Sequence, residues 1–109
     1  MGYRKNKVTS LLHHLVAPEI AKLLPDAIIT VTRVETSADI RHATVFISVF
    51  PEKNEQQILR ALTQHCKKLN RKLFTRLAMK IPPAIVFQID RQEQQQRRIE
   101  KLLREVITS

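Results

Sequence analysis

Apolar residues recur every three or four positions from 58 to 77, which is the spacing that places side chains on one face of an α-helix. This apolar face consists of Ile58, Leu62, Cys66, Leu69, Leu73 and Leu77. Pro82 and Pro83 end the pattern, because proline cannot continue a helix. An unbroken helix over residues 55–79 would be about 37 Å long, whereas a domain of this size has a radius of gyration of about 13 Å. We therefore predict that the helix bends, near the stretch from Cys66 to Asn70.

Three segments have the composition and alternation of β-strands. Ala27 to Thr36 is rich in Ile, Val and Thr, and His42 to Phe50 alternates two sets of side chains. The link between them is short and polar, so we expect an antiparallel hairpin in which Ser37 and Asp39 bond their own turn. After the two prolines, Ala84 to Ile89 alternates in the same way and predicts a third strand.

Helices are predicted at both ends of the chain. Residues 4–24 carry apolar side chains on one side, but Pro18 interrupts the pattern. Either this helix bends near Ala17, which we expect, or a second helix begins with Pro18 in its first turn. The last helix starts at Asp90, and its residues 92–98 are polar all round, which predicts a frayed or exposed segment. An apolar stripe follows, formed by Ile99, Leu102, Leu103 and Val106. The element order is α-β-β-α-β-α, and 109 residues support a single α+β domain over 1–109.

Positive charge is concentrated in the second half of the chain. Of a formal net charge of +9, residues 1–54 contribute +2 and residues 55–109 contribute +7. No acidic residue lies between Glu55 and Asp90, so the cations of the central helix have no local carboxylate partner. A polyanionic partner, either nucleic acid or an acidic membrane surface, would supply the missing charge, although a solvated basic face is almost as good an interpretation. The predicted phosphate contacts are Lys67, Lys68, Arg71, Lys72 and Arg76, with Arg60 and Lys80 as lesser candidates.

The sequence offers no pattern that is typical of an enzyme or a metalloprotein. His13 and His14 are adjacent and point to different sides of a helix, so they cannot chelate one metal ion together. No nucleophile stands near a base, and no phosphate loop or carboxylate pair appears. We expect no enzyme activity, no cofactor, no metal and no small-molecule substrate. A membrane span and a secretory signal are also missing from the pattern, so we expect a cytoplasmic protein with one reduced cysteine, Cys66.

Three segments resemble a known family. Residues 31–45 read VTRVETSADIRHATV, which is similar to the hairpin pattern Val-x-x-Ser-x-Asp-Leu-x-x-Ala-x-Val. Residues 73–77 read LFTRL and residues 80–90 read KIPPAIVFQID, similar to Leu-x-x-Arg-Leu followed by Pro-x-Leu-x-Phe-x-x-Asp. Ile99, Leu102 and Leu103 match a closing Ile-x-x-Leu-Leu. With these segments the chain resembles the ribosome-binding factor A family.

The resemblance implies a KH-like α+β fold of the type II order, in which helices back a three-stranded sheet and the second helix is kinked. Family members usually bend that helix at an Ala-x-Gly, whereas the corresponding residues here are about His65-Cys66-Lys67. The only glycine in the chain is Gly2, so the bend must be milder or made by another residue. The GxxG loop of ordinary KH domains is also absent.

The resemblance further implies an assembly factor that binds the free or immature 30S small ribosomal subunit. Its partner would be 16S rRNA, whose processing and maturation it would assist as a monomer. Two alternatives stay open. One is a general RNA- or DNA-binding KH-like module that uses the same basic helix face. The other is a protein-interaction or dimerising module in which Phe46 and Phe50 face a partner.

Overall fold

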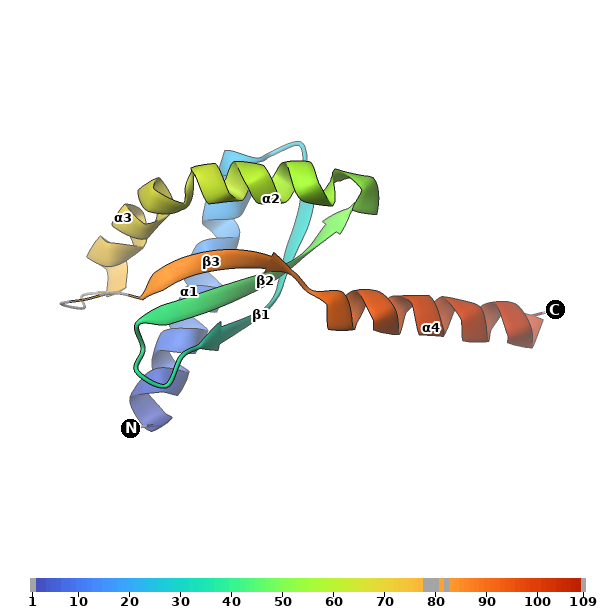
Figure 1. Ribbon diagram of the computed structural model, residues 1–109, viewed down its shortest axis with the longest axis horizontal. Coiled ribbons are helices and arrows are strands. Elements are labelled where there is room, and N and C mark those ends of the chain that lie inside the picture. Colours follow the sequence, from blue (N-terminus) through green and yellow to red (C-terminus); the bar gives the residue numbers. More distant parts are fainter. Residues whose placement is uncertain (1, 78–80, 82, 109) are drawn as a thin grey trace.

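The computed structural model describes residues 2–77, 81 and 83–108 and shows helices packed on one small sheet (Figure 1). Its element order confirms the predicted α-β-β-α-β-α arrangement, with a short 3-10 turn added after the second strand. The elements are α1 (Gly2–Leu23), β1 (Ile28–Thr36), β2 (His42–Phe50), η1 (Glu52–Asn54), α2 (Glu55–Gln64), α3 (Cys66–Leu77), β3 (Ala84–Ile89) and α4 (Arg91–Thr108). Every predicted strand begins and ends within one residue of its predicted bounds.

The three strands form one sheet in the order β1-β2-β3. β1 and β2 are antiparallel, as the hairpin prediction requires, and β2 and β3 are parallel. The hairpin turn is closed by its own side chains: Ser37 Oγ donates to Asp39 Oδ1 over 2.6 Å, and the backbone N–H of Arg41 donates to the same oxygen over 3.1 Å. These two hydrogen bonds hold the pKa of Asp39 below its ordinary value. Ser37 and Asp39 therefore act in the turn, as predicted.

The hydrophobic core lies between one face of the sheet and the helices α1, α2 and α3. Alternation along β2 supplies its inward side, since Val45 and Ile47 are fully buried while Phe46 between them is half-buried on the other face. The helices contribute apolar side chains at helical spacing; Leu12, Val16, Leu62 and Leu73 are among the largest that are fully buried. Burying each such side chain stabilises the fold by about 1.5–3 kcal/mol.

α1 continues through Pro18 as a single helix, so the alternative of a second helix beginning there is wrong. Pro18 is exposed, which leaves its ring on the solvent side of the helix. The buried side of α1 is carried by Val8, Leu12, Val16 and Ile20. Packing of this apolar side against the sheet offsets the hydrogen bond that a proline inside a helix removes.

The predicted bend in the central helix is present and lies at His65, directly beside the stretch from Cys66 to Asn70. His65 has φ −92° and ψ 3°, a bridge conformation whose negative φ does not require glycine. Helical hydrogen bonds continue on both sides, because His65 N–H donates to Ala61 O over 3.2 Å and Leu69 N–H donates to His65 O over 3.0 Å. The break is therefore mild and needs no glycine.

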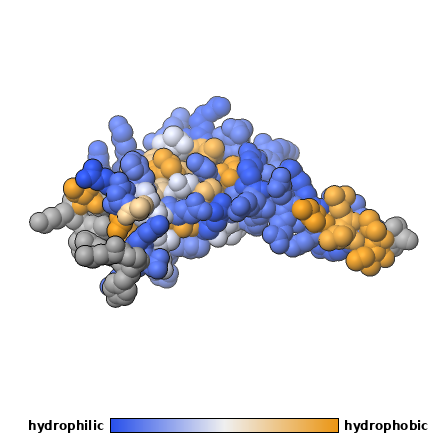
Figure 2. Space-filling view, turned by 60° about the horizontal axis from the view of Figure 1, so that its bottom comes forward, coloured by the Kyte–Doolittle hydropathy of each residue, from blue (hydrophilic) through white to orange (hydrophobic). Residues whose placement is uncertain are grey.

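The predicted exposure of residues 92–98 in α4 is confirmed at most positions, but this segment is a regular helix and is not frayed. The polar first half of α4 is anchored to the domain: Gln94 is buried, Arg91 pairs with Glu55 over 3.1 Å, and Arg98 pairs with Glu52 over 3.0 Å. Its apolar second half projects away from the domain (Figure 1), with Ile99, Leu102, Leu103 and Val106 all more than half exposed. Figure 2 shows this end as a hydrophobic surface beyond a largely hydrophilic body. None of the described helices is long and apolar enough to span a bilayer.

Candidate nucleic-acid interface

The basic residues of α3 form an exposed surface, which we name the α3 cationic surface and define as Lys67, Lys68, Arg71 and Lys72. All four side chains are exposed. Their positions on α3 follow from the buried side of the helix, because Leu69 and Leu73 pack in the core and turn the basic positions outward. Arg76 belongs to α3, but its side chain, like the whole of Lys80, lies outside the described residues.

Arg60 is also exposed, but it belongs to α2 and so lies on the other side of the break at His65. It lines a shallow pocket of about 270 Å³ with Gln56, Leu59, Thr63 and Gln64. All residues that line this pocket belong to α2 and none to α3. Arg60 is therefore not part of the α3 cationic surface.

The central cations have no local carboxylate partner in the sequence, but the fold brings a distant one to Lys72. Glu19 of α1 lies against it, with Lys72 Nζ 3.3 Å from Glu19 Oε2. Glu19 also pairs with Lys22, whose Nζ lies 3.8 Å from Oε1. The partner was missed because 53 residues separate Glu19 from Lys72, and only the packing of α1 on α3 brings them together. Among the described side chains, no ion pair involves Lys67, Lys68 or Arg71.

A pocket of about 260 Å³ opens where the end of α1 meets the start of α3. It is lined by Glu19, Lys22, Leu23, His65, Lys68, Leu69 and Lys72. Three ammonium groups against one carboxylate give the lining an excess of positive charge. Such a lining favours an anion, and lysine ammonium groups donate hydrogen bonds without accepting any.

Besides Glu19, the polar residues of this pocket that sequence reasoning did not select are Lys22 and His65. Lys22 stands in the last turn of α1, where a lone lysine is a common helix-end residue. Its spacing from Glu19, three residues along one helix face, is the signal that could have linked the two. His65 lines the pocket because the helix breaks at that residue.

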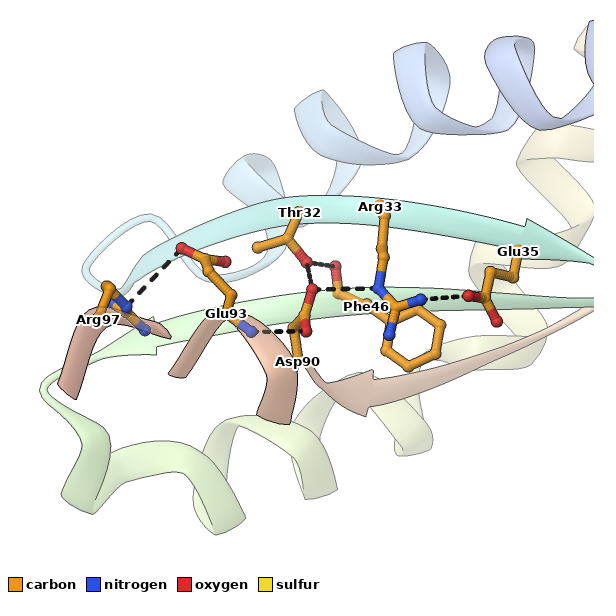
Figure 3. A network of polar contacts seen from close by, with 7 residues as sticks. All are labelled: Thr32, Arg33, Glu35, Phe46, Asp90, Glu93 and Arg97. Carbon is orange, nitrogen blue, oxygen red and sulfur yellow. Dashed lines mark hydrogen bonds and ion pairs between the residues drawn. The ribbon is translucent and has the colours of Figure 1, made fainter. Parts of the chain in front are cut away.

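A second polar cluster joins the sheet to α4 (Figure 3). Asp90 is buried, and its Oδ2 accepts hydrogen bonds from Thr32 Oγ1 over 2.6 Å and from Arg33 Nε over 3.3 Å. Its Oδ1 accepts from the backbone N–H of Glu93 over 3.1 Å, which caps the first turn of α4. Thr32 reaches Asp90 because it is the extra residue of a β-bulge between Val31 and Arg33.

Electrostatics keep this carboxylate ionised. Burial raises the pKa of Asp90, but the hydrogen bonds from Thr32, from the Glu93 backbone and from Arg33 outweigh burial and hold the pKa below its ordinary value. Arg33 also pairs with Glu35 and lies over the Phe46 ring, 3.8 Å from its centroid. Phe46 is thus half-buried under Arg33, whereas Phe50 is 64% exposed. These contacts make the cluster a structural joint between the sheet and α4.

No group of three or more His, Cys, Asp or Glu side chains that could hold a metal ion occurs among the described residues. Cys66 is half-buried; its Sγ donates to Ile85 O over 2.7 Å, and burial raises the pKa of its thiol. A thiol held in this way is a poor nucleophile.

A three-stranded sheet backed by α1 and a broken α2–α3 helix pair, with basic residues along α3, defines a small protein of the KH-like α+β class. The GxxG loop of ordinary KH domains is absent from the sequence. A family model described as ribosome-binding factor A matches residues 4–103. The chain belongs to the ribosome-binding factor A family.

Sequence relatives cover nearly the whole chain. A ribosome-binding factor A of Rhodopseudomonas palustris is 36% identical over 107 residues, which are 93% of this chain and 79% of the relative. A ribosome-binding factor A of Natranaerobius thermophilus is 33% identical over 109 residues, or 96% of this chain and 83% of the relative.

Solved structures agree with this assignment. The crystal structure of ribosome-binding factor A from Thermus thermophilus matches with a TM-score of 0.71 at 29% identity, covering 78% of this chain and 93% of that one. A model of the Thermus thermophilus protein that was fitted into a cryo-electron-microscopy map of its 30S complex matches with a TM-score of 0.66 at 28% identity over the same shares. The fold prediction is therefore confirmed.

Proposed function

We propose that this protein is a ribosome assembly factor that binds the free or immature 30S small ribosomal subunit, mainly through phosphates of 16S rRNA. Family membership and the 30S complex of the Thermus thermophilus relative support the partner. The observation that carries the RNA contact is the α3 cationic surface, in which Lys67, Lys68 and Arg71 are exposed and form no ion pair with any described residue.

The α3 cationic surface would bind RNA by its charge density. Each cation that neutralises a phosphate releases a condensed counterion, so binding weakens steeply as salt rises. Such contacts position a protein on RNA without reading its sequence. Selectivity for the 30S subunit then comes from the shape of the rRNA that fits α3 and the helices around it.

The proposed role is non-catalytic and is exerted in the cytoplasm, where ribosomes are assembled. The protein would hold an immature conformation of 16S rRNA, assist its processing by other factors, and then dissociate. Support comes from the α3 cationic surface, whose lysine and arginine side chains suit binding to phosphates, and from the Cys66 thiol beside it, which is half-buried and donates to Ile85 O.

Co-sedimentation tests this proposal with three proteins and a salt series. Wild type should pellet with purified small subunits and not with large ones, and salt should remove it. Replacing Lys67, Lys68 and Arg71 by alanine should abolish pelleting at salt concentrations where wild type still binds, because three phosphate contacts are lost. The matched control replaces the exposed residues Arg41, Lys53 and Lys101, which removes the same charge from other surfaces.

Equal loss in both triple variants would mean that net charge alone drives binding, which contradicts the assigned surface. Equal binding of wild type to both subunits would favour a general RNA-binding module. If wild type pelleted with neither subunit, the assembly-factor role would be wrong.

A further inference from the structure

The pocket between α1 and α3 has features of a site and not only of a gap between helices. Its wall combines two elements that are far apart in the sequence, the last turn of α1 and the first two turns of α3. Leu69 of the lining is part of the hydrophobic core, and Leu23 is half-buried. One side of the pocket is therefore formed by a core residue.

Glu19 organises the charges around this pocket. Its side chain is only 6% exposed, yet it holds Lys72 at 3.3 Å and Lys22 at 3.8 Å. Each ammonium carries three N–H donors, so one bond to Glu19 leaves donors available for a ligand. Lys68 adds a third ammonium, and it forms no ion pair with any described residue. The lining thus keeps a net charge of about +2 after Glu19 is counted.

We propose that this pocket binds one phosphate group of RNA through Lys22, Lys68 and Lys72, with Glu19 as the positioning residue that holds two of the three lysines. The leucines of the lining offer an apolar wall to the attached sugar. This inference rests on the proposed RNA-binding function and extends it, because α1 becomes part of an interface otherwise made by α3 alone. The pocket volume of about 260 Å³ lies below the roughly 300–1,000 Å³ of drug-sized ligand sites, which suits one small group such as a phosphate.

The test uses Lys22, since it lies outside the basic run of α3 and its side chain is 68% exposed. Lys22→Ala should bind a short single-stranded RNA severalfold more weakly than wild type, and the slope of log affinity against log salt should fall by about one unit. Lys53→Ala is the matched control, because it removes the same charge from the exposed turn η1. Fluorescence anisotropy with a labelled oligonucleotide measures both quantities.

The possible outcomes distinguish a failure of the pocket assignment from a failure of the proposed assembly role. If wild type binds small subunits and RNA but Lys22→Ala has the salt slope of Lys53→Ala, the pocket assignment is overturned while the assembly role stands. If wild type binds neither small subunits nor RNA, both the pocket assignment and the assembly role are wrong. Repeating the titration with 5′-hydroxyl and 5′-phosphate oligonucleotides identifies the phosphate: equal loss with both indicates an internal phosphodiester, and loss only with the second indicates a terminal phosphate.

Glu19→Gln tests the positioning role by the sign of its effect. The variant is one charge more positive, so a purely electrostatic surface would bind RNA more tightly. If Glu19 places Lys22 and Lys72, the variant should bind more weakly at an unchanged melting temperature. Tighter binding would overturn the positioning role, because Glu19 would then be only a competitor of the phosphate.

Discussion

Asp90 shows how a single side chain can join three elements. It follows β3, accepts hydrogen bonds from Thr32 and Arg33 of β1, and caps α4 through the N–H of Glu93. Because the carboxylate is buried, each of these bonds is shielded from competing water. Asp90 is therefore one of the residues that hold the start of α4 against the sheet (Figure 3).

Asp90→Asn should lower the free energy of unfolding by about 1–3 kcal/mol, since the amide weakens the cap and leaves Arg33 without a buried anionic partner. Urea unfolding at neutral pH measures the change. Asp26→Asn, an exposed aspartate, is the matched control and should be close to neutral.

The pH dependence of this difference has a definite sign. Because the pKa of Asp90 is lowered in the folded state, its contribution is fully present above the ordinary aspartate pKa and is lost as pH falls through the folded value. The gap between wild type and Asp90→Asn should therefore close on acidification. A gap that stays constant down to that range would contradict the ionised network.

At the scale of elements, the break between α2 and α3 depends on backbone geometry that is open to ordinary residues. His65 has negative φ, so a glycine there would add flexibility to the unfolded chain without relieving strain in the folded one. The kink that family members usually make at an Ala-x-Gly is made here within a helix whose hydrogen bonds are nearly continuous.

His65→Gly should be less stable than His65→Ala by about 0.4–1 kcal/mol. Thermal and urea unfolding of the two variants, compared with each other and not only with wild type, isolate the backbone effect from loss of the imidazole. A glycine variant more stable than the alanine variant would mean that residue 65 requires a conformation reserved for glycine.

Elements were predictable because each has a local signal, and the site was predictable only in part because it is assembled from distant segments. The alternation in β2 and the leucine spacing of α3 place their own buried sides. By contrast, the pairing of Lys72 with Glu19 exists only after α1 packs on α3. The bulge at Thr32 is only weakly indicated by the sequence. Val31 and Val34 are apolar but three residues apart, whereas a regular strand places residues of one face two apart.

At the scale of the whole molecule, the chain is a small domain with a long projection. The principal extents are 57 × 32 × 17 Å and the radius of gyration of the Cα atoms is 15.8 Å, against about 13 Å for a compact domain of this length. The outer half of α4 accounts for the excess, and its apolar side chains add little to the core because they are exposed.

Deleting residues 99–109 should therefore leave the free energy of unfolding within about 0.5 kcal/mol of wild type, while the radius of gyration in small-angle scattering falls toward about 13 Å. Deleting residues 91–109 is the contrasting variant, because it also removes the pair of Arg91 with Glu55 and the buried Gln94. That variant should be clearly destabilised. Equal destabilisation by both deletions would mean that the outer half of α4 packs on the domain.

The bulge in β1 also determines where this fold can change its length. On either side of Thr32 the strand keeps a strict two-residue rhythm: Val31 faces the helices, Arg33 faces away, and Val34 faces the helices again. Removing Thr32 would join two halves that are already in phase, so every remaining side chain would keep its face. Thr32 is thus an extra residue in an otherwise regular β-strand. Relatives that lack one residue at this point would keep the same core but lose the hydrogen bond from Thr32 to Asp90 at the start of α4.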